Sequence, residues 1–164
     1  MDSGVRIEID LSDLTSALAG LDRIGSKLPT EDLMSDIGAR LEYSTRERIL
    51  STKTSPDGTP WPANAEGTSI LLRTGDHLLG SIAWTASATE TEVGSSWQFA
   101  HVHQEGMTIS AKNAERLSFV VGGRHVSKKS VTIPARPFVG MSAEDAAKID
   151  RLATAFVAKH LVAK

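Results

Sequence analysis

Two histidines and a glutamate come closest to a metal-site pattern in this chain. His101 and His103 stand two residues apart, and Glu105 follows at the same interval. On a strand, residues two apart point to the same side, so three potential ligands would lie together. On a short helix across 97–105, the two histidines would point to different sides. The other histidines lie far away and form no pattern with them, so we expect no metal here.

No other group of residues predicts catalysis. The chain has no cysteine, which excludes disulfides, thiolate metal ligands and cysteine nucleophiles. None of its serines stands in a Gly-x-Ser-x-Gly elbow, and it has no glycine-rich phosphate-binding loop. We therefore expect no enzyme activity and no cofactor. A metal-dependent hydrolase that uses His101, His103 and Glu105 is the alternative.

The charge balance does not favour nucleic-acid binding as the main role. The chain has 18 Lys and Arg against 20 Asp and Glu, whereas proteins that grip nucleic acid usually show a basic excess or stripe. The nearest basic cluster stands among glycine and serine residues, which favours a solvated loop. Contact with a phosphate or an acidic partner is the alternative. This cluster consists of Arg124, His125, Lys128 and Lys129.

The amino-terminal third of the chain predicts one strand and two helices. Apolar and polar residues alternate from Val5 to Asp10, which is typical of a half-buried strand. Leucines then recur every three or four residues over 11–24, which indicates an amphipathic helix. A second helix is expected to begin at Thr30 as its cap, with acidic residues in its first turn.

The rest of the chain predicts strands followed by a final helix. We expect extended chain at 70–72, a short helix at 78–82, and strands at 82–89, 91–95, 107–110, 117–121 and 131–133, with another short helix within 97–105. Ser142 should cap a helix that ends at about Val162. Helices segregated from strands predict an α+β fold, with an antiparallel β-sheet packed by N-terminal helices and a C-terminal helix.

The length of 164 residues fits one domain with four regions. They are a mainly helical region at 1–50, a Pro/Gly-rich loop at 51–68, a sheet region at 69–140 and a C-terminal helix at 142–163. The first ten residues do not resemble a signal peptide, and no apolar run approaches the roughly 20 residues that span a bilayer. Aromatic residues make up only 5%, so the core should be mostly aliphatic.

Trp61 is the unusual residue of the loop at 51–68, because it lies between two prolines. Prolines hold a tryptophan rigidly, so its side chain either fills the core of its own domain or anchors a partner. Filling the core is the favoured interpretation. Replacement of Trp61 by alanine should then impair folding or assembly.

Short motifs follow one another in a fixed order between residues 55 and 140. They are Ser-Pro-Asp-Gly-Thr-Pro-Trp at 55–61, Leu-Leu-Arg-Thr-Gly at 71–75, Val-Gly-Ser at 93–95, His-Gln-x-Gly at 103–106 and Ala-Arg-Pro-Phe-Val-Gly at 135–140. This order resembles the phage virion morphogenesis family, the tail completion proteins of Mu-like and related tailed phages. The resemblance covers about residues 30–155, although 110–130 match nothing in it.

The motifs also have a physical interpretation as parts of a scaffold. Pro137 should hold Arg136 in an extended conformation, and Phe138 should enter a pocket just before the last helix. The polar side chains of His103 and Gln104 can bind loop backbone. The glycine that follows them permits a sharp exit of the chain.

The resemblance implies a phage virion protein that completes the tail or joins it to the head by oligomeric binding rather than by catalysis. The expected partners are further copies of the chain in a ring, sixfold to match a tail tube, together with tail tube or tail terminator proteins and head connector proteins. The expected locations are the virion and, during assembly, the host cytoplasm, with no membrane contact. DNA contact should be absent or incidental, and a DNA-contacting portal accessory that uses the basic cluster is a further alternative. The candidate interface residues are Trp61, His103, Gln104, Arg136 and Phe138.

Overall fold

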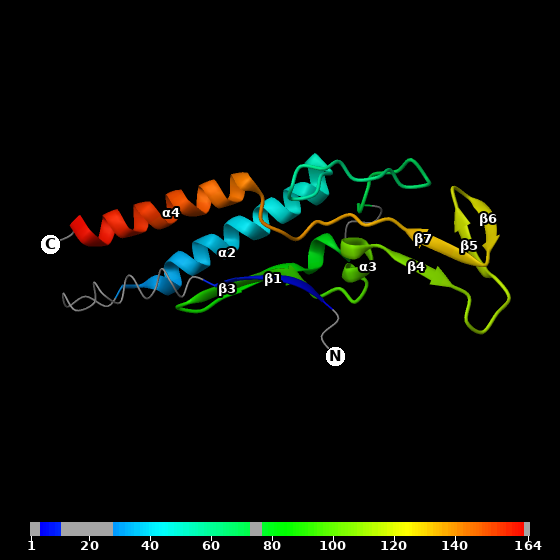
Figure 1. The fold of residues 1–164 in the computed structure, drawn as a ribbon, viewed down its shortest axis with the longest axis horizontal. Helices are drawn as coiled ribbons and strands as arrows, with labels where there is room; N and C mark the ends of the chain where they lie inside the picture. The colour runs from blue at the N-terminus through cyan, green and yellow to red at the C-terminus, as the bar shows by residue number, and fades with distance from the viewer. Residues whose placement is uncertain (1–3, 11–27, 73–76, 163–164) are drawn as a thin grey trace.

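The computed structural model describes residues 4–10, 28–72 and 77–162, which form an elongated α+β molecule (Figure 1). Strand β1 (Val5–Asp10) confirms the alternating pattern. The helix predicted at 11–24 lies outside the described residues. Helix α2 (Thr30–Glu47) continues into the π-helical turn η1 (Arg48–Thr52). The prediction that Thr30 caps α2 is wrong, because Pro29 holds the cap position and no side chain bonds to the helix start.

A three-stranded antiparallel sheet packs one face against α2. Strands β2 (Ile82–Ala86) and β3 (Glu90–Ser95) follow each other, and β1 pairs on the other side of β3. Val93 lies opposite both Ile7 and Trp84, so the apolar residues of all three strands share one face. That face forms a core with the buried residues of α2, which are Leu33, Met34, Ile37 and Leu41.

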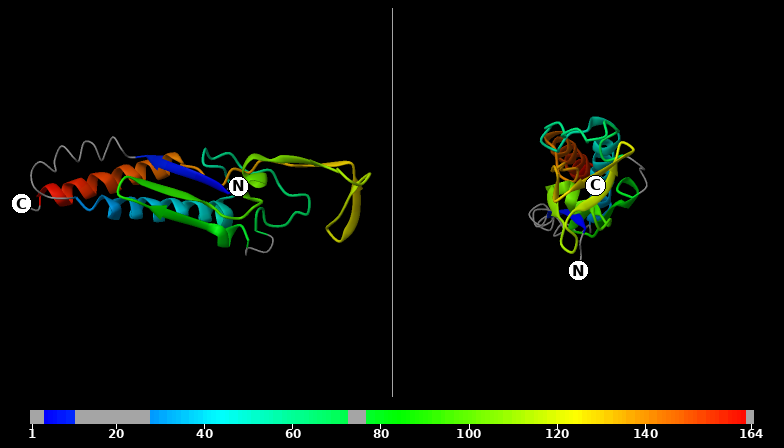
Figure 2. Two further views of the ribbon diagram at one scale, coloured as in Figure 1. Left: turned by 90° about the horizontal axis from the view of Figure 1, so that it is seen from below. Right: turned by 90° about the vertical axis from the view of Figure 1, so that its right-hand side faces the viewer.

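Helix α4 (Ala143–Val162) lies alongside α2, and both run along the long axis of the molecule (Figure 2). Ile149, Leu152 and Phe156 pack against the same core, so they form the inner, apolar face of this helix. Ser142 confirms its predicted role as the cap. Its Oγ accepts a bond from the Asp145 backbone N, while Asp145 Oδ2 accepts a bond from the Ser142 backbone N.

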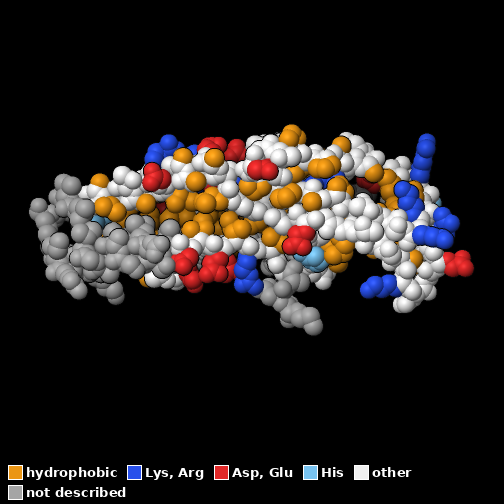
Figure 3. Space-filling view, in the orientation of Figure 1, with side chains coloured by type: hydrophobic (Ala, Val, Ile, Leu, Met, Phe, Trp, Pro, Cys, Tyr) orange, Lys and Arg blue, Asp and Glu red, His pale blue; other side chains and the backbone are white. Residues whose placement is uncertain are grey.

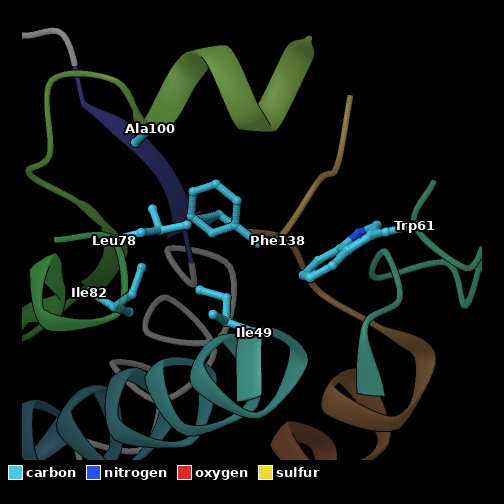
Figure 4. Close-up of a cluster of buried hydrophobic side chains, with 7 residues drawn as sticks. Ile49, Trp61, Leu78, Ile82, Ala100 and Phe138 are labelled. Atoms are coloured by element: carbon cyan, nitrogen blue, oxygen red, sulfur yellow. The ribbon is translucent and has the colours of Figure 1, made fainter. Parts of the chain in front are cut away.

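A second core joins the loops to the sheet and the helices (Figure 4). Phe138 lies at its centre, with Leu78, Ala100 and Ile49 around its ring. The buried side chains of this cluster are Ile49, Trp61, Leu78, Ile82, Ala100, Phe138 and Val139. Two short helices border it, the 3₁₀ turn η2 (Leu79–Ser81) and helix α3 (Ala100–Glu105). Residues 70–72, predicted to be extended, form a turn instead, with Leu71 at a φ of 57°.

Residues 107–133 form an extension, here called the arm, at one end of the molecule (Figures 1 and 2). Strand β4 (Met107–Ser110) pairs with β7 (Ser130–Ile133), and β5 (Leu117–Val121) pairs with β6 (Arg124–Lys128). The described strands therefore form three antiparallel sheets rather than the single sheet we expected. None of the described helices is long and apolar enough to cross a membrane.

The basic segment predicted as a loop is in fact strand β6. Its sequence lacks the apolar alternation typical of a strand, so the local pattern does not predict one. The turn before it explains why a strand forms. Gly122 and Gly123 have φ values of 56° and 76° and connect Val121 directly to its partner Arg124. Two-residue turns with positive φ match the twist of paired strands, so this turn sets the register of the hairpin.

Candidate functional site

The motif residues meet at one place, here called the motif junction, which consists of Trp61, His103, Gln104, Arg136 and Phe138. Gln104 forms its centre. The Gln104 side-chain oxygen accepts bonds from the backbone N of Phe138 at 3.0 Å and of Val139 at 3.1 Å. Its amide nitrogen donates to Val139 O at 2.9 Å. One side chain thereby bonds the segment before α4 much as a neighbouring strand would.

Arg136 and Trp61 hold the Pro-rich loop against the same segment. Arg136 is only 5% exposed, and its guanidinium donates to Pro62 O at 2.9 Å and to Ala63 O at 3.2 Å. Burial lowers the pKa of Arg136 below its ordinary value. Trp61 donates from Nε1 to Pro137 O at 3.1 Å. Both side chains therefore satisfy backbone carbonyls that regular structure leaves unpaired.

Phe138 and Gly106 confirm the predictions made for these two residues, whereas the buried Nδ1 of His103, predicted to bind loop backbone, has no partner among the described residues. The Phe138 side chain is fully buried just before α4. Gly106 ends α3 at a φ of 74°, and a Cβ there would lie 2.6 Å from Ala135 N. Only glycine allows this backbone conformation and this close approach together. The Arg136 backbone N then donates to His103 O at 2.7 Å, which closes the junction.

His103 belongs to a stack of rings beside the junction. The Trp97 ring is nearly parallel to the rings of His77 and His103, at centroid distances of 6.1 and 5.7 Å. These rings and Arg136 line a hollow of about 340 Å³. Burial, and then the charge of Arg136, lower the pKa of His103 below its ordinary value. The neutral imidazole is therefore favoured at neutral pH.

The strand-like arrangement that would make a metal site is not formed. His101 and His103 lie on helix α3, where residues two apart point to different sides. Across residues 4–10, 28–72 and 77–162, no three His, Asp or Glu side chains gather closely enough to hold a metal ion. The metal-dependent hydrolase thus has no supporting geometry in this part of the chain.

A buried ion pair, which no pattern in the sequence predicts, connects α4 to the rest of the molecule. Arg48 Nη2 lies 2.5 Å from Asp145 Oδ2, and Arg48 Nη1 donates to Phe138 O at 3.2 Å. Ser44 donates a further bond to Asp145 at 3.1 Å, and Ser142 Oγ donates one at 2.7 Å. The Ser-x-x-Asp spacing signals the helix cap, but nothing local signals a partner 97 residues away.

The environment of Asp145 keeps its carboxylate ionised. Burial by itself raises the pKa of Asp145. The hydrogen bonds from Ser142, the charge of Arg48 and the bond from Ser44 outweigh burial, so the pKa lies below its ordinary value. Burial lowers the pKa of Arg48, and the charge of Asp145 offsets part of that effect. Because arginine stays protonated in proteins, the two groups form a charged pair.

The fold and the junction define an α+β protein whose motif residues brace its own interior. Trp61, Gln104 and Arg136 direct their polar groups to backbone of the same chain. The chain belongs to the phage virion morphogenesis family, whose family model matches residues 9–158. No curated protein and no solved structure matches the chain. Membership gives it a role in phage virion assembly and an association with the virion.

Proposed function

We propose that this protein completes the phage tail or joins it to the head, and that it acts by oligomeric binding rather than by catalysis. The observation that carries the proposal is the internal use of the family motifs. Gln104 alone makes three bonds to the 138–139 backbone, and Phe138 is fully buried. Motif residues that bond to backbone of their own chain stabilise the fold. A protein whose motifs have this structural role is expected to act by binding partners with its surface.

The exposed apolar side chains support a binding role. Three of them, Met107, Ile109 and Val120, lie on the arm. Large apolar side chains that gather on a projecting element are typical of surfaces that a partner covers. The large hydrophobic residues exposed by 39% or more among the described residues are Tyr43, Leu50, Phe99, Met107, Ile109, Val120 and Met141.

The five junction residues are also candidates for direct contact at the interface, and that role stays a prediction. Trp61 is 5% exposed and Phe138 is fully buried, which favours the core interpretation of Trp61. We propose an indirect role for the junction: it holds the Pro-rich loop and the start of α4 in the shape that a partner recognises.

The proposed partners follow from the place of a tail completion protein in a virion. Copies of the chain form a ring, sixfold to match a tail tube, and the ring contacts tail tube or tail terminator proteins on one side and head connector proteins on the other. Assembly takes place in the host cytoplasm. A ring requires that two different surfaces of one subunit fit each other.

The experiment is electron microscopy of lysates from the encoding phage with this gene deleted. We expect DNA-filled heads that lie apart from tails, or tails of abnormal form, because the joining step is lost. A plasmid copy of the wild-type gene is the control, and it should restore joined particles. Normal, infectious particles from the deletion phage would refute the proposed role.

A further inference from the structure

The arm carries a charge opposite to that of the rest of the chain. It holds five of the 18 basic residues but only one of the 20 acidic residues, Glu115, which gives it a formal charge of +4 and leaves −6 on the remainder. Lys and Arg side chains gather at the arm end of the molecule in Figure 3, whereas Asp and Glu side chains gather on the body. The basic residues of the arm are Lys112, Arg116, Arg124, Lys128 and Lys129.

The arm has no core of its own. None of residues 107–133 is buried, and both of its sheets have only two strands. Two-stranded ribbons are marginally stable in water without something to pack against. One described contact to the body is the bond from Gly122 N to the Glu66 carboxylate at 3.1 Å. The arm thus leaves most of its surface available to a partner.

One face of the β5–β6 hairpin has the composition of an interface. Residues directly opposite in an antiparallel pair share a face, so Phe119 with Val126, Leu117 with Lys128, and Val121 with Arg124 lie on one side. The result is an apolar strip of half-exposed side chains with a cation at each end. An apolar centre with a charged rim is typical of protein–protein contacts.

The outer face of the three-stranded sheet offers the complementary charge. Glu8 lies directly opposite Glu92, and Asp10 lies directly opposite Glu90. Like charges in directly opposed positions destabilise a strand pair. Arg6 forms an ion pair with Glu92 at 3.0 Å, but both side chains remain well exposed, at 48% and 38%. A cationic partner on this face would add attraction for Glu8 and Glu92, which lie directly opposite each other.

We propose that the arm of one copy docks on the outer face of the β1–β3–β2 sheet of a second copy, with Arg124 and Lys128 beside Glu8 and Glu92. This inference rests on the proposed self-assembly and names the two surfaces that make it. Arm and sheet face are different surfaces of one subunit, so the contact is head to tail and repeats from copy to copy, as a ring requires. DNA fits less well, because the whole chain carries a net charge of −2.

Charge reversal on each surface, separately and together, tests the docking. The arm variant is Arg124→Glu with Lys128→Glu, the sheet variant is Glu8→Lys with Glu92→Lys, and the combined variant carries all four changes. The matched control reverses two exposed cations of α4, Arg151→Glu with Lys159→Glu, and changes the net charge as much as the arm variant does. Circular dichroism checks that each variant folds.

Self-association is measured by sedimentation equilibrium at low and high salt, and infectious yield is measured after complementation of the deletion phage. We expect the arm and sheet variants each to weaken association on the order of a hundredfold, which corresponds to about 2.8 kcal/mol, because attractive charge pairs become repulsive. The combined variant should recover both association and yield, and the control should resemble wild type. Salt should weaken the wild-type contact.

The outcomes separate the docking from the proposed function. If wild type associates and the deletion phage lacks joined particles, but the arm variant behaves as wild type, the docking is refuted and the proposed function stands. Failure of the combined variant to recover also refutes the docking. Salt-dependent binding of a DNA duplex that the arm variant loses and the combined variant does not regain would assign the arm to DNA instead. A deletion phage with normal particles refutes both proposals.

Discussion

Replacement of Asp145 by asparagine removes a buried charge while it keeps the shape of the side chain. The Asp145 carboxylate accepts bonds from Arg48 Nη2 at 2.5 Å, Ser142 Oγ at 2.7 Å and Ser44 Oγ at 3.1 Å. Every one of these neighbours donates. All three bonds fall on Oδ2, while Arg40 Nη2 lies 3.4 Å from Oδ1. An asparagine oxygen can take the place of Oδ2, but its amide nitrogen would then face the Arg40 guanidinium, and the negative charge is lost. The variant therefore leaves the Arg48 guanidinium without its counter-ion.

The burial of the two side chains sets the size of the effect. The Asp145 side chain is 1% exposed and the Arg48 side chain is 7% exposed, so water cannot replace the lost partner. Removal of one partner from a buried ion pair costs about 3–5 kcal/mol of the free energy of unfolding. Arg48→Met combined with Asp145→Asn also removes the Arg48 charge and leaves only Arg40, whose side chain is 20% exposed, so it should recover most of that loss.

Urea unfolding followed by circular dichroism measures these free energies. The control is Glu144→Gln at the neighbouring position, where the side chain is 72% exposed and pairs with Lys148 at the surface. It should cost far less than Asp145→Asn, because an exposed ion pair contributes little in water. The reasoning would be refuted if Asp145→Asn cost no more than Glu144→Gln, or if the double variant were no more stable than the single one.

The acid dependence of stability gives a second measurement on the same pair. The pKa of Asp145 in the folded protein lies below its ordinary value, so its contribution is complete above the unfolded value of about 3.9. The contribution disappears as the pH falls through the lower, folded value. The difference in unfolding free energy between wild type and Asp145→Asn should therefore shrink in strong acid. A constant difference down to the lowest accessible pH would contradict this linkage.

Three further perturbations test the motif junction. Gln104→Ala should cost about 2–4 kcal/mol in urea unfolding, because it leaves buried backbone groups at 138–139 unpaired, and a loss under about 1 kcal/mol would show that water replaces the side chain. Gly106→Ala should cost more than about 2 kcal/mol of the free energy of unfolding, since it combines a positive φ with a backbone nitrogen 2.6 Å from the new Cβ. Gly80→Ala, where no atom lies within 4 Å of the new Cβ, should cost much less, and equal losses would count against the steric argument. The free energy of unfolding should fall as the pH drops through about 6.5, because burial and a neighbouring guanidinium lower the pKa of His103, so the unfolded chain binds more protons. His103→Phe should reduce this dependence of the unfolding free energy on pH, and an unchanged dependence would assign it to other groups.

Much of the fold follows from local patterns in the sequence. The alternation at 5–10 predicts β1, and the acidic residues directly after Thr30 predict the start of α2. Ser142 and Asp145 predict the start of α4, since a helix cap forms between residues only three apart. Each of these predictions is correct because the residues that determine the element lie within a few positions of one another in the chain.

The predictions are wrong where the local sequence pattern of a segment is weak, or where the segment that it pairs with determines its conformation. Strand β6 has no apolar alternation, and its register comes from the Gly122–Gly123 turn and the pairing with β5. The cap of α2 falls on Pro29, although Thr30 is the better capping residue by type. The division of the strands into three sheets depends on how the chain crosses between them, which no local pattern records.

At the candidate site, too, some features follow from the sequence and others depend on the tertiary structure. By itself, the sequence determined that Trp61, Gln104, Arg136 and Phe138 belong to ordered motifs of one family, because motif order is a property of the linear chain. Only the tertiary structure decided that these side chains turn inward, that Arg48 meets Asp145, and that the basic residues project on an arm without a core. Those features depend on contacts between residues far apart in the chain, and the free energy of such contacts exists only once the chain has folded.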